Sequence, residues 1–214
     1  MWVLNVDSND VRREWAERSG EYSPAYYAHY GADETSESVA DILTEYVDCE
    51  ASVLELGSSS GRHLEHLRAS GFEDLSGIEL NEDAFDVMAD QYPALYDSGS
   101  FYVDAIENVV EDFADDAFDA VYSVETLQHI HPDAEWVFAE VARTTGELLV
   151  TVESESPEAD AEREECEDGP DRSYVRDEFP LYYRDWADVF TGLGFEHVER
   201  RDGHRDTIRA FRPR

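Results

Sequence analysis

A turn built from small residues stands where a ligand can approach the backbone closely. Residues 53–67 read VLELGSSSGRHLEHL, which is an apolar run, a glycine- and serine-rich turn and a helical pattern. Gly57 and Gly61 permit backbone conformations and a close approach that side chains would obstruct. The free N–H groups of the following helix would also face the ligand. Because turns favour glycine and serine in any case, the motif also fits an ordinary connection between a strand and a helix.

Two carboxylates follow apolar runs further along the chain. Glu79 ends the segment GIE about 20 residues beyond the turn, a position from which a carboxylate can accept hydrogen bonds from ribose hydroxyls. Asp104 follows SFYV, where a carboxylate can accept a hydrogen bond from an adenine amino group. Each acid taken alone also fits one more surface residue of an acidic chain. Together with the turn, the two acids indicate an adenosine-type ligand.

Three side chains that can take up a proton follow the next apolar run. Glu125, His129 and His131 belong to FDAVYSVETLQHIHPD, residues 118–133. A histidine suits proton transfer near neutral pH, and such a base is needed only if a reacting group must lose a proton. Both histidines also fit a packing role at the start of the following helix. A metal site formed by His129 and His131 with Glu125 or Asp133 would lack a firmly placed third ligand, so we expect no bound metal.

The positions of these residues depend on an alternation of strand and helix patterns. Apolar runs predict strands at 52–56, 75–80, 100–104, 118–124, 147–152, 194–201 and 206–212, and amphipathic patterns predict helices at 61–70, 82–91, 133–143 and 184–192. Strands separated by helix-length segments predict an α/β fold, with a doubly wound, mostly parallel seven-stranded sheet and helices on both faces. The last two strands are too close in sequence for a parallel crossover, so we expect a terminal antiparallel hairpin.

Two segments lie outside this alternation. Residues 1–33 are interpreted as a helical N-terminal extension, and residues 34–214 as the main domain. The tyrosines of the extension either cap a ligand pocket, contact a substrate or simply pack against the core: Tyr22, Tyr26, Tyr27 and Tyr30. Residues 153–172 have almost nothing to bury, so we expect a solvated loop, either a lid or an insertion.

Length and composition restrict the class of protein. The chain of 214 residues is long enough for one compact domain. It has no apolar run near the ~20 residues that cross a bilayer, and its charged start does not fit a signal peptide, so we expect a soluble cytoplasmic protein. Cys49 and Cys166 lie far apart and are expected to be free thiols.

The net charge of −36 is the most unusual property of the sequence. It arises from 52 acidic and 16 basic residues, and every basic residue is arginine. The acids are spread along the chain, which predicts a self-repelling surface that concentrated salt would screen. The composition resembles that of halophilic proteins; a basic partner is the alternative, although such partners usually meet a localised block of charge. No nucleic acid is expected as a partner, because its phosphates would be repelled.

Taken together, these motifs resemble the class I S-adenosylmethionine-dependent methyltransferases over roughly residues 34–214. ELGSSSG is similar to motif I of that family, with Ser59 where glycine is common, and residues 118–133 resemble its motif IV. Glu79 and Asp104 match its motif II and motif III acids. The resemblance implies a Rossmann-like fold and S-adenosylmethionine as cofactor. It implies cofactor contacts from Glu55, Gly57, Ser58, Ser59, Gly61, Glu79, Leu80, Asp104, Ala105, Ser123 and Val124.

The resemblance also implies what such a reaction requires of the protein. The sulfonium makes the methyl group electrophilic, so the protein must mainly align a nucleophile and exclude water. Glu125, His129 or His131 would act as general base where the acceptor has to lose a proton. We expect a small-molecule methyl acceptor, and the sequence indicates no particular oligomeric state.

Two other functions are compatible with such a fold. An NAD-dependent oxidoreductase would carry the fingerprint G-x-G-x-x-G, but a fingerprint beginning at Gly57 meets Ser59 and Arg62 where glycines are required. A non-catalytic cofactor-binding protein of the same fold is the second alternative.

Overall fold

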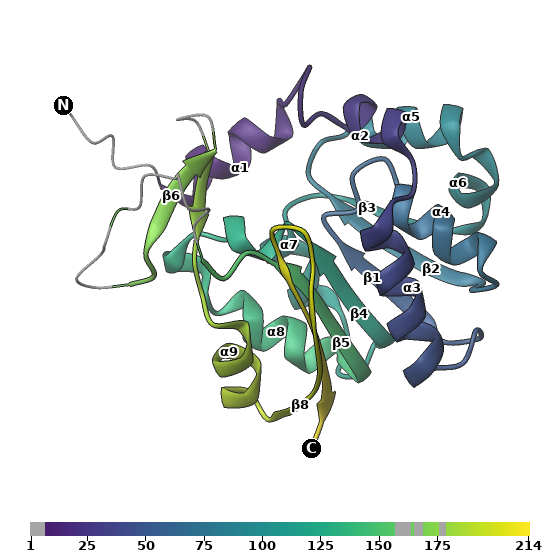
Figure 1. Ribbon diagram of the computed structural model, residues 1–214. Helices are drawn as coiled ribbons and strands as arrows, with labels where there is room; N and C mark the ends of the chain where they lie inside the picture. The colour runs from purple at the N-terminus through teal and green to yellow at the C-terminus, as the bar shows by residue number, and fades with distance from the viewer. Residues whose placement is uncertain (1–6, 157–163, 165–168, 176–178) are drawn as a thin grey trace.

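The computed structural model describes residues 7–156, 164, 169–175 and 179–214. Seven strands of this part of the chain form one sheet in the order β3-β2-β1-β4-β5-β9-β8 (Figure 1). They are β1 Ser52–Leu56, β2 Asp74–Glu79, β3 Ser100–Val103, β4 Phe118–Val124, β5 Thr145–Glu153, β8 Phe195–Asp202 and β9 Thr207–Pro213. The first five pair in parallel, whereas β9 is antiparallel to β5 and β8. This confirms the predicted fold class, including the terminal hairpin.

Helices cover both faces of the sheet. Successive residues of a strand point to opposite faces, so the central strands present apolar side chains to the helices on each side. The described α-helices are α1 Ser8–Ala16, α2 Pro24–Tyr30, α3 Glu34–Tyr46, α4 Arg62–Ala69, α5 Asp83–Gln91, α6 Pro93–Ser98, α7 Ile106–Val109, α8 Val137–Thr144 and α9 Trp186–Gly192. Val53 of β1 belongs to the core that α3, α4 and α5 cover. Its neighbour Leu54 belongs to the core that α8 and α9 cover. Central strands are thus buried on both faces and read as continuous apolar runs.

Three of the four predicted helices, 61–70, 82–91 and 184–192, are confirmed as α4, α5 and α9. The fourth, 133–143, is wrong in its first part, where Pro132–Ala134 forms a short 3-10 turn and α8 begins only at Val137. The side chain of His131 accepts the N–H of Asp133 and so caps this separate turn. The sequence pattern also missed α6 and α7.

The prediction that residues 153–172 form a solvated loop is wrong at both ends. Glu153 is the last residue of β5 and is fully buried. Arg172 begins β6 (Arg172–Val175), which pairs with β7 (Phe179–Tyr182) in a second, two-stranded sheet. Residues 157–163 and 165–168 lie outside the described part of the chain, and so does the expectation for them. Among the described residues of this acidic window, Glu153 is the buried carboxylate, and its burial has no local signal in the window.

The segment before α3 is helical, as its pattern indicates. Figure 1 shows α1 and α2 at the top of the molecule, where α1 contacts β7 and α2 contacts α5. The boundary between an extension of residues 1–33 and a domain of residues 34–214 stays a prediction. No helix among the described residues is long and apolar enough to span a membrane. Cys49 is a free thiol, and Cys166 lies outside the described residues.

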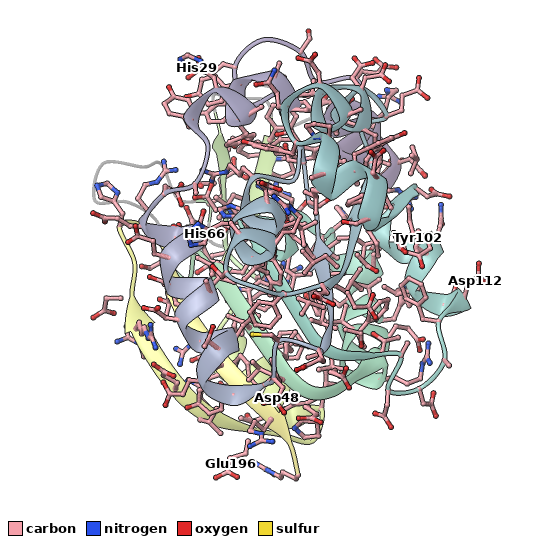
Figure 2. All side chains as sticks on the ribbon, turned by 90° about the vertical axis from the view of Figure 1, so that its right-hand side faces the viewer. His29, Asp48, His66, Tyr102, Asp112 and Glu196 are labelled. Carbon is pink, nitrogen blue, oxygen red and sulfur yellow. The ribbon has the colours of Figure 1, made fainter. Side chains whose placement is uncertain are left out.

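Acidic side chains surround the molecule rather than gather in one block. Figure 2 labels Asp48, Asp112 and Glu196 at well separated places on the molecule, and all three are exposed. A distributed charge of this kind agrees with the expectation of a self-repelling surface at low salt. The halophilic character itself stays a prediction.

Candidate functional site

A cavity of about 170 Å³ lies where β1, β2, β3 and β4 end. One ordered water needs only ~10–15 Å³, so the cavity has room for a small molecule. It lies at the carboxyl ends of parallel strands, beside the point where the strand order reverses between β1 and β4. Open α/β sheets bind their ligands at this place. The N-terminal segment covers the cavity with Ser8, Val11, Arg12, Trp15, Arg18, Tyr22, Pro24 and Tyr27.

The structure brings most of the predicted site residues together around this cavity. Those that line it are Gly57, Ser58, Ser59, Glu79, Leu80, Asp104, Ala105, Val124, Glu125, His129 and His131. Glu55, Gly61 and Ser123 do not line it, and their contact with a cofactor stays a prediction. Among the described residues, no group of three metal-ligating side chains is placed to hold a metal ion.

The turn after β1 is tied to the end of β2. The N–H groups of Gly57 and Ser58 donate to the carbonyl oxygen of Ile78, each at 2.9 Å. Glu79 accepts the N–H of Ser59 on Oε2 and the N–H of Asn81 on Oε1, both at 2.8 Å. Burial raises the pKa of Glu79, and these backbone donors partly offset that effect. Each of its oxygens retains a lone pair, so the carboxylate can still accept hydrogen bonds from a ligand.

Asp104 follows the end of β3 and stands next to Glu79, whose carbonyl oxygen accepts the N–H of Asp104 at 3.2 Å. Its Oδ1 accepts the N–H of Ala105 at 2.7 Å and the side-chain amide of Asn108 at 2.8 Å. Although Asp104 is exposed, it also lines the cavity. Oδ1 is therefore held by the protein. Oδ2 accepts no hydrogen bond from the described residues and can accept one from a ligand.

Gly57 adopts a left-handed backbone conformation with φ +74° beside the turn that follows β4. A Cβ at this position would stand 2.3 Å from Oγ1 of Thr126. The close approach of two turns, rather than ligand contact alone, therefore requires glycine here.

We expect Gly57→Ala to lower the free energy of unfolding by about 2–4 kcal/mol, because a strained backbone and an overlap in a packed region add together. Urea unfolding in concentrated KCl measures the change. Gly192→Ala is the control, since a Cβ there meets nothing within 4 Å and the φ is not positive. Equal effects of the two substitutions would contradict this explanation.

The three predicted residues outside the cavity lining contact other parts of the protein. Glu55 is paired in register with Tyr122 of β4 and is 1% exposed, and burial raises its pKa well above the usual range. A Cβ on Gly61 would meet the side chains of Met88 and Leu95 at 2.8 Å, so this glycine accommodates helix packing. Ser123 donates to the buried carboxylate of Glu153 at 2.7 Å.

Glu153 is a site residue that the sequence pattern missed. Its carboxylate accepts hydrogen bonds from Ser123 and from the backbone of residues 126–128, which follow β4. Burial raises its pKa to about 7, although these donors favour the ionised form. Like Glu79, Glu153 is the last residue of a buried strand, and this position is the signal that could have identified it. The acidic residues that follow make it look like part of a loop.

Glu125 lies at the cavity wall with a left-handed backbone, φ +48°. Its carboxylate stands 3.7 Å from the guanidinium of Arg205, in the turn between β8 and β9. Burial and the neighbouring carboxylate of Asp206 raise the pKa of Glu125 to about 7, and Arg205 offsets part of this rise. Glu125 therefore becomes a proton acceptor only near and above neutral pH.

His129 is held in one tautomer. Its Nδ1 lies 2.9 Å from the carbonyl oxygen of Pro180, and because a carbonyl only accepts, Nδ1 must carry the hydrogen. Nε2 is then the nitrogen with a lone pair. Burial lowers the pKa of His129 to about 4, which keeps the ring neutral at neutral pH. The ring of Trp15 packs against it with centroids 4.9 Å apart.

His131 is held in the opposite tautomer. Its Nδ1 accepts the N–H of Asp133 at 3.2 Å, so the hydrogen of a neutral ring stands on Nε2. This side chain can donate a hydrogen bond from Nε2 but cannot accept a proton there. The two predicted base candidates of the same segment therefore differ in what they can do.

The N-terminal segment that covers the cavity, called here the roof, is bonded to residues that follow β2 and β3. Asn81 donates its side-chain amide to the carbonyl oxygen of Arg18 at 3.0 Å, and Arg12 stands 3.8 Å from Glu107. Of the predicted tyrosines, Tyr22 and Tyr27 line the cavity, whereas Tyr30 is 61% exposed. The aromatic cluster therefore divides into two members at the cavity and others that pack or face solvent.

Comparison with protein families identifies one matching domain. Residues 53–147 match the family model described as a methyltransferase domain. A search of the curated proteins finds no sequence that matches this chain.

Solved structures with a similar fold extend over nearly the whole chain. A protein from Pyrococcus horikoshii has a TM-score of 0.67 at 16% identity, over 94% of this chain and 95% of that one. Magnesium protoporphyrin IX methyltransferase from Synechocystis, with bound SAM, has 0.61 at 14%, over 96% and 90%. The cyclase SpnF has 0.63 at 14%, over 93% and 85%. Residues 53–147 are thus similar to a methyltransferase domain, and the described part of the chain shares its fold with these solved structures.

Proposed function

We propose that this protein is an S-adenosylmethionine-dependent methyltransferase that acts on a small-molecule acceptor. The observation that carries the proposal is the convergence of the turn at 57–59, Glu79 and Asp104 on one cavity at the switch point of the sheet. The sequence predicted each of these features separately, and the fold brings them to a single place. The methyltransferase domain match over residues 53–147 supports the same cofactor.

The residues around the cavity fit an adenosyl cofactor by their hydrogen-bonding capacity. Glu79 retains acceptor capacity for ribose hydroxyls, and Asp104 for an adenine amino group. Ser58 is 1% exposed, and its hydroxyl finds no partner among the described residues. This hydroxyl stands beside Gly77 of β2, where a Cβ would be 2.6 Å from it, so the fit to the cofactor rests on Glu79 and Asp104. In this proposal the turn at 57–59 holds the methionine end.

The protein's part in the reaction is positioning. When bound, the cofactor supplies a methyl group on a sulfonium, which is already electrophilic. Trp15, Tyr22 and Tyr27 line the cavity and so shield one side of the reacting groups from water. Holding an acceptor in line with the methyl group can lower the barrier by several kcal/mol.

His129 is the proposed general base for an acceptor that must lose a proton. Its ring is neutral and carries its lone pair on Nε2, because Nδ1 is engaged with Pro180. His131 presents N–H at the same ring position, and Glu125 is paired with Arg205 and holds its proton up to about pH 7. Among the three predicted candidates, His129 is therefore the one whose ring is neutral, with a lone pair on Nε2, below neutral pH.

A small acceptor is favoured by the enclosure of the cavity and by the charge. Residues of α1 line part of the cavity, so the N-terminal segment restricts the access of a macromolecule to it. The net charge of −36 also opposes RNA. A cyclase among the similar structures has this fold as well, so the non-catalytic and non-methylating alternatives have to be tested directly.

Binding calorimetry separates the two cofactor classes. We expect S-adenosylhomocysteine to bind with a dissociation constant in the micromolar range and NAD not to bind at the same concentrations. The buffer contains concentrated KCl, because a net charge of −36 is self-repelling at low ionic strength. Binding of NAD without binding of S-adenosylhomocysteine would refute the proposed function.

A methyl-acceptor screen then separates an enzyme from a binding protein. The full-length protein is incubated with methyl-labelled S-adenosylmethionine and fractionated small-molecule extract. Transfer of label to a low-molecular-weight component supports the proposal. Cofactor binding without transfer to any fraction would instead favour a non-catalytic protein of this fold.

A further inference from the structure

The segment that carries His129 and Glu125 has little regular structure of its own. Residues 125–129, called here the base turn, follow β4 and contain only the short 3-10 helix Leu127–His129. His129 and Glu125 line the cavity, and Thr126 approaches Gly57 of the cofactor turn. A displacement of the base turn would therefore change how the two candidate bases stand relative to the cofactor turn.

One buried carboxylate attaches the base turn to the neighbouring strand. Oε1 of Glu153 accepts the N–H groups of Thr126 at 3.2 Å and Leu127 at 3.0 Å, and Oε2 accepts the N–H of Gln128 at 3.1 Å. Ser123 donates its hydroxyl to the same Oε1 at 2.7 Å. Three consecutive backbone N–H groups, which a 3-10 turn leaves without partners inside the turn, are thus satisfied by a single side chain that is 0% exposed.

Two further hydrogen bonds join the base turn to the residues on either side of Glu153. The N–H of Glu125 donates to the carbonyl oxygen of Val152 at 2.8 Å, which continues the pairing between β4 and β5. The N–H of Ser154 donates to Oε1 of Gln128 at 2.7 Å, so β5 also uses the side chain of the turn. Every residue from 125 to 128 is therefore bonded to the segment 152–154.

We propose that Glu153 is a positioning residue that holds the base turn, and with it His129, at a fixed place beside the cofactor turn. The inference rests on the methyltransferase function proposed above. Glu153 does not line the cavity and acts only through the groups it holds. A displacement of about 1 Å in a reacting group can lower a rate about 100-fold, so this attachment matters for turnover more than for cofactor binding.

Glu153→Gln tests this role with the smallest change of shape. An amide places one NH2 group against the backbone N–H donors, so it removes an acceptor and inserts a donor in a buried site. Glu147→Gln is the matched control, because it lies on the same strand and is exposed. Gln128→Ala is a second variant that releases the turn from the side of Ser154 while leaving the carboxylate in place.

Three measurements on the full-length protein give the result. Amide hydrogen exchange of the base turn is expected to accelerate in Glu153→Gln and not in Glu147→Gln. Calorimetry with S-adenosylhomocysteine is expected to give a dissociation constant within about twofold of the unmodified protein, while kcat with the acceptor from the screen falls about 10- to 100-fold. A merely structural role would lower the folded fraction and would reduce binding capacity and kcat together.

The inference and the proposed function fail in different ways. Unchanged exchange in the base turn, or faster exchange with unchanged kcat, would overturn the role of Glu153 even if the cofactor binds. If the unmodified protein does not bind S-adenosylhomocysteine, the proposed function fails, whereas the exchange experiment still reports on the attachment. If Glu153→Gln does not fold, Gln128→Ala has to show the same separation of kcat from binding, and its absence overturns the inference.

Discussion

Replacing Glu79 by alanine is expected to weaken binding of S-adenosylhomocysteine about a hundredfold. Hydrogen bonds to a charged group contribute about 1.5–3 kcal/mol each, so the loss of two bonds to ribose hydroxyls at the low end of this range corresponds to about this factor. The substitution also removes the acceptor for the N–H of Ser59, which loosens the turn that holds the other end of the ligand. Titration calorimetry in concentrated KCl measures the change without knowledge of the methyl acceptor.

Glu73→Ala is the matched control for the Glu79 experiment. Glu73 is an exposed acid that immediately precedes β2, so its removal changes the net charge equally without touching the cavity. We expect the dissociation constant of this variant to stay within about twofold of the unmodified value, as for a surface substitution. If both variants weaken binding equally, the effect comes from overall charge, and the ribose assignment of Glu79 is wrong.

His129→Asn is expected to lower kcat about a hundredfold or more when the acceptor has to lose a proton, which is the usual contribution of a general base. The side-chain NH2 of asparagine can take the place of Nδ1 and keep donating to the carbonyl of Pro180. The variant then lacks only the basic nitrogen. His131→Asn is the comparison, because an asparagine oxygen can still accept the N–H of Asp133. A larger loss of kcat in His131→Asn than in His129→Asn would contradict the assignment and would indicate His131 as the general base.

The protonation of His129 can be checked without an acceptor. Because burial lowers its pKa from 6.5 to about 4, we expect its ring nitrogen NMR signals to remain those of the neutral Nδ1–H tautomer between pH 8 and 5. Below pH 6.5 the unfolded state binds a proton at this residue and the folded state does not. His129 therefore stabilises the fold least at low pH, where its contribution is lost as pH falls from 6.5 toward 4. A titration near pH 6.5 would contradict the buried neutral ring.

Much of the fold follows from local patterns in the sequence. The β1 run VLEL and the β4 run FDAVYSV are apolar on both faces because helices cover both sides of the sheet. The hairpin of β8 and β9 follows from the short connection around Gly203. Glu79 and Asp104 could be found because each ends a strand, and parallel strands place their carboxyl ends at one edge.

The failures have a common physical origin, which is that a side chain's partner lies far away in sequence. Glu153 was assigned to a solvated loop because the residues after it are acidic, whereas its donors at 126–128 come from another strand's end. The packing at Gly61 is likewise a distant contact, because the lack of a side chain there accommodates Met88 and Leu95, while its contact with a cofactor stays a prediction. No local pattern contains these contacts.

The sequence by itself determined the seven strands of the main sheet, three of the helices between them, the small-residue turn and the acids at the strand ends, because these depend on local periodicity and residue type. Only the tertiary structure decided which polar groups are protonated and which face the cavity. His129 and His131 are two residues apart, yet one meets a distant carbonyl and the other a neighbouring N–H, so their tautomers are opposite. A hydrogen bond requires the fold to bring donor and acceptor within about 3 Å of each other, and the spacing of residues along the chain does not predict that distance.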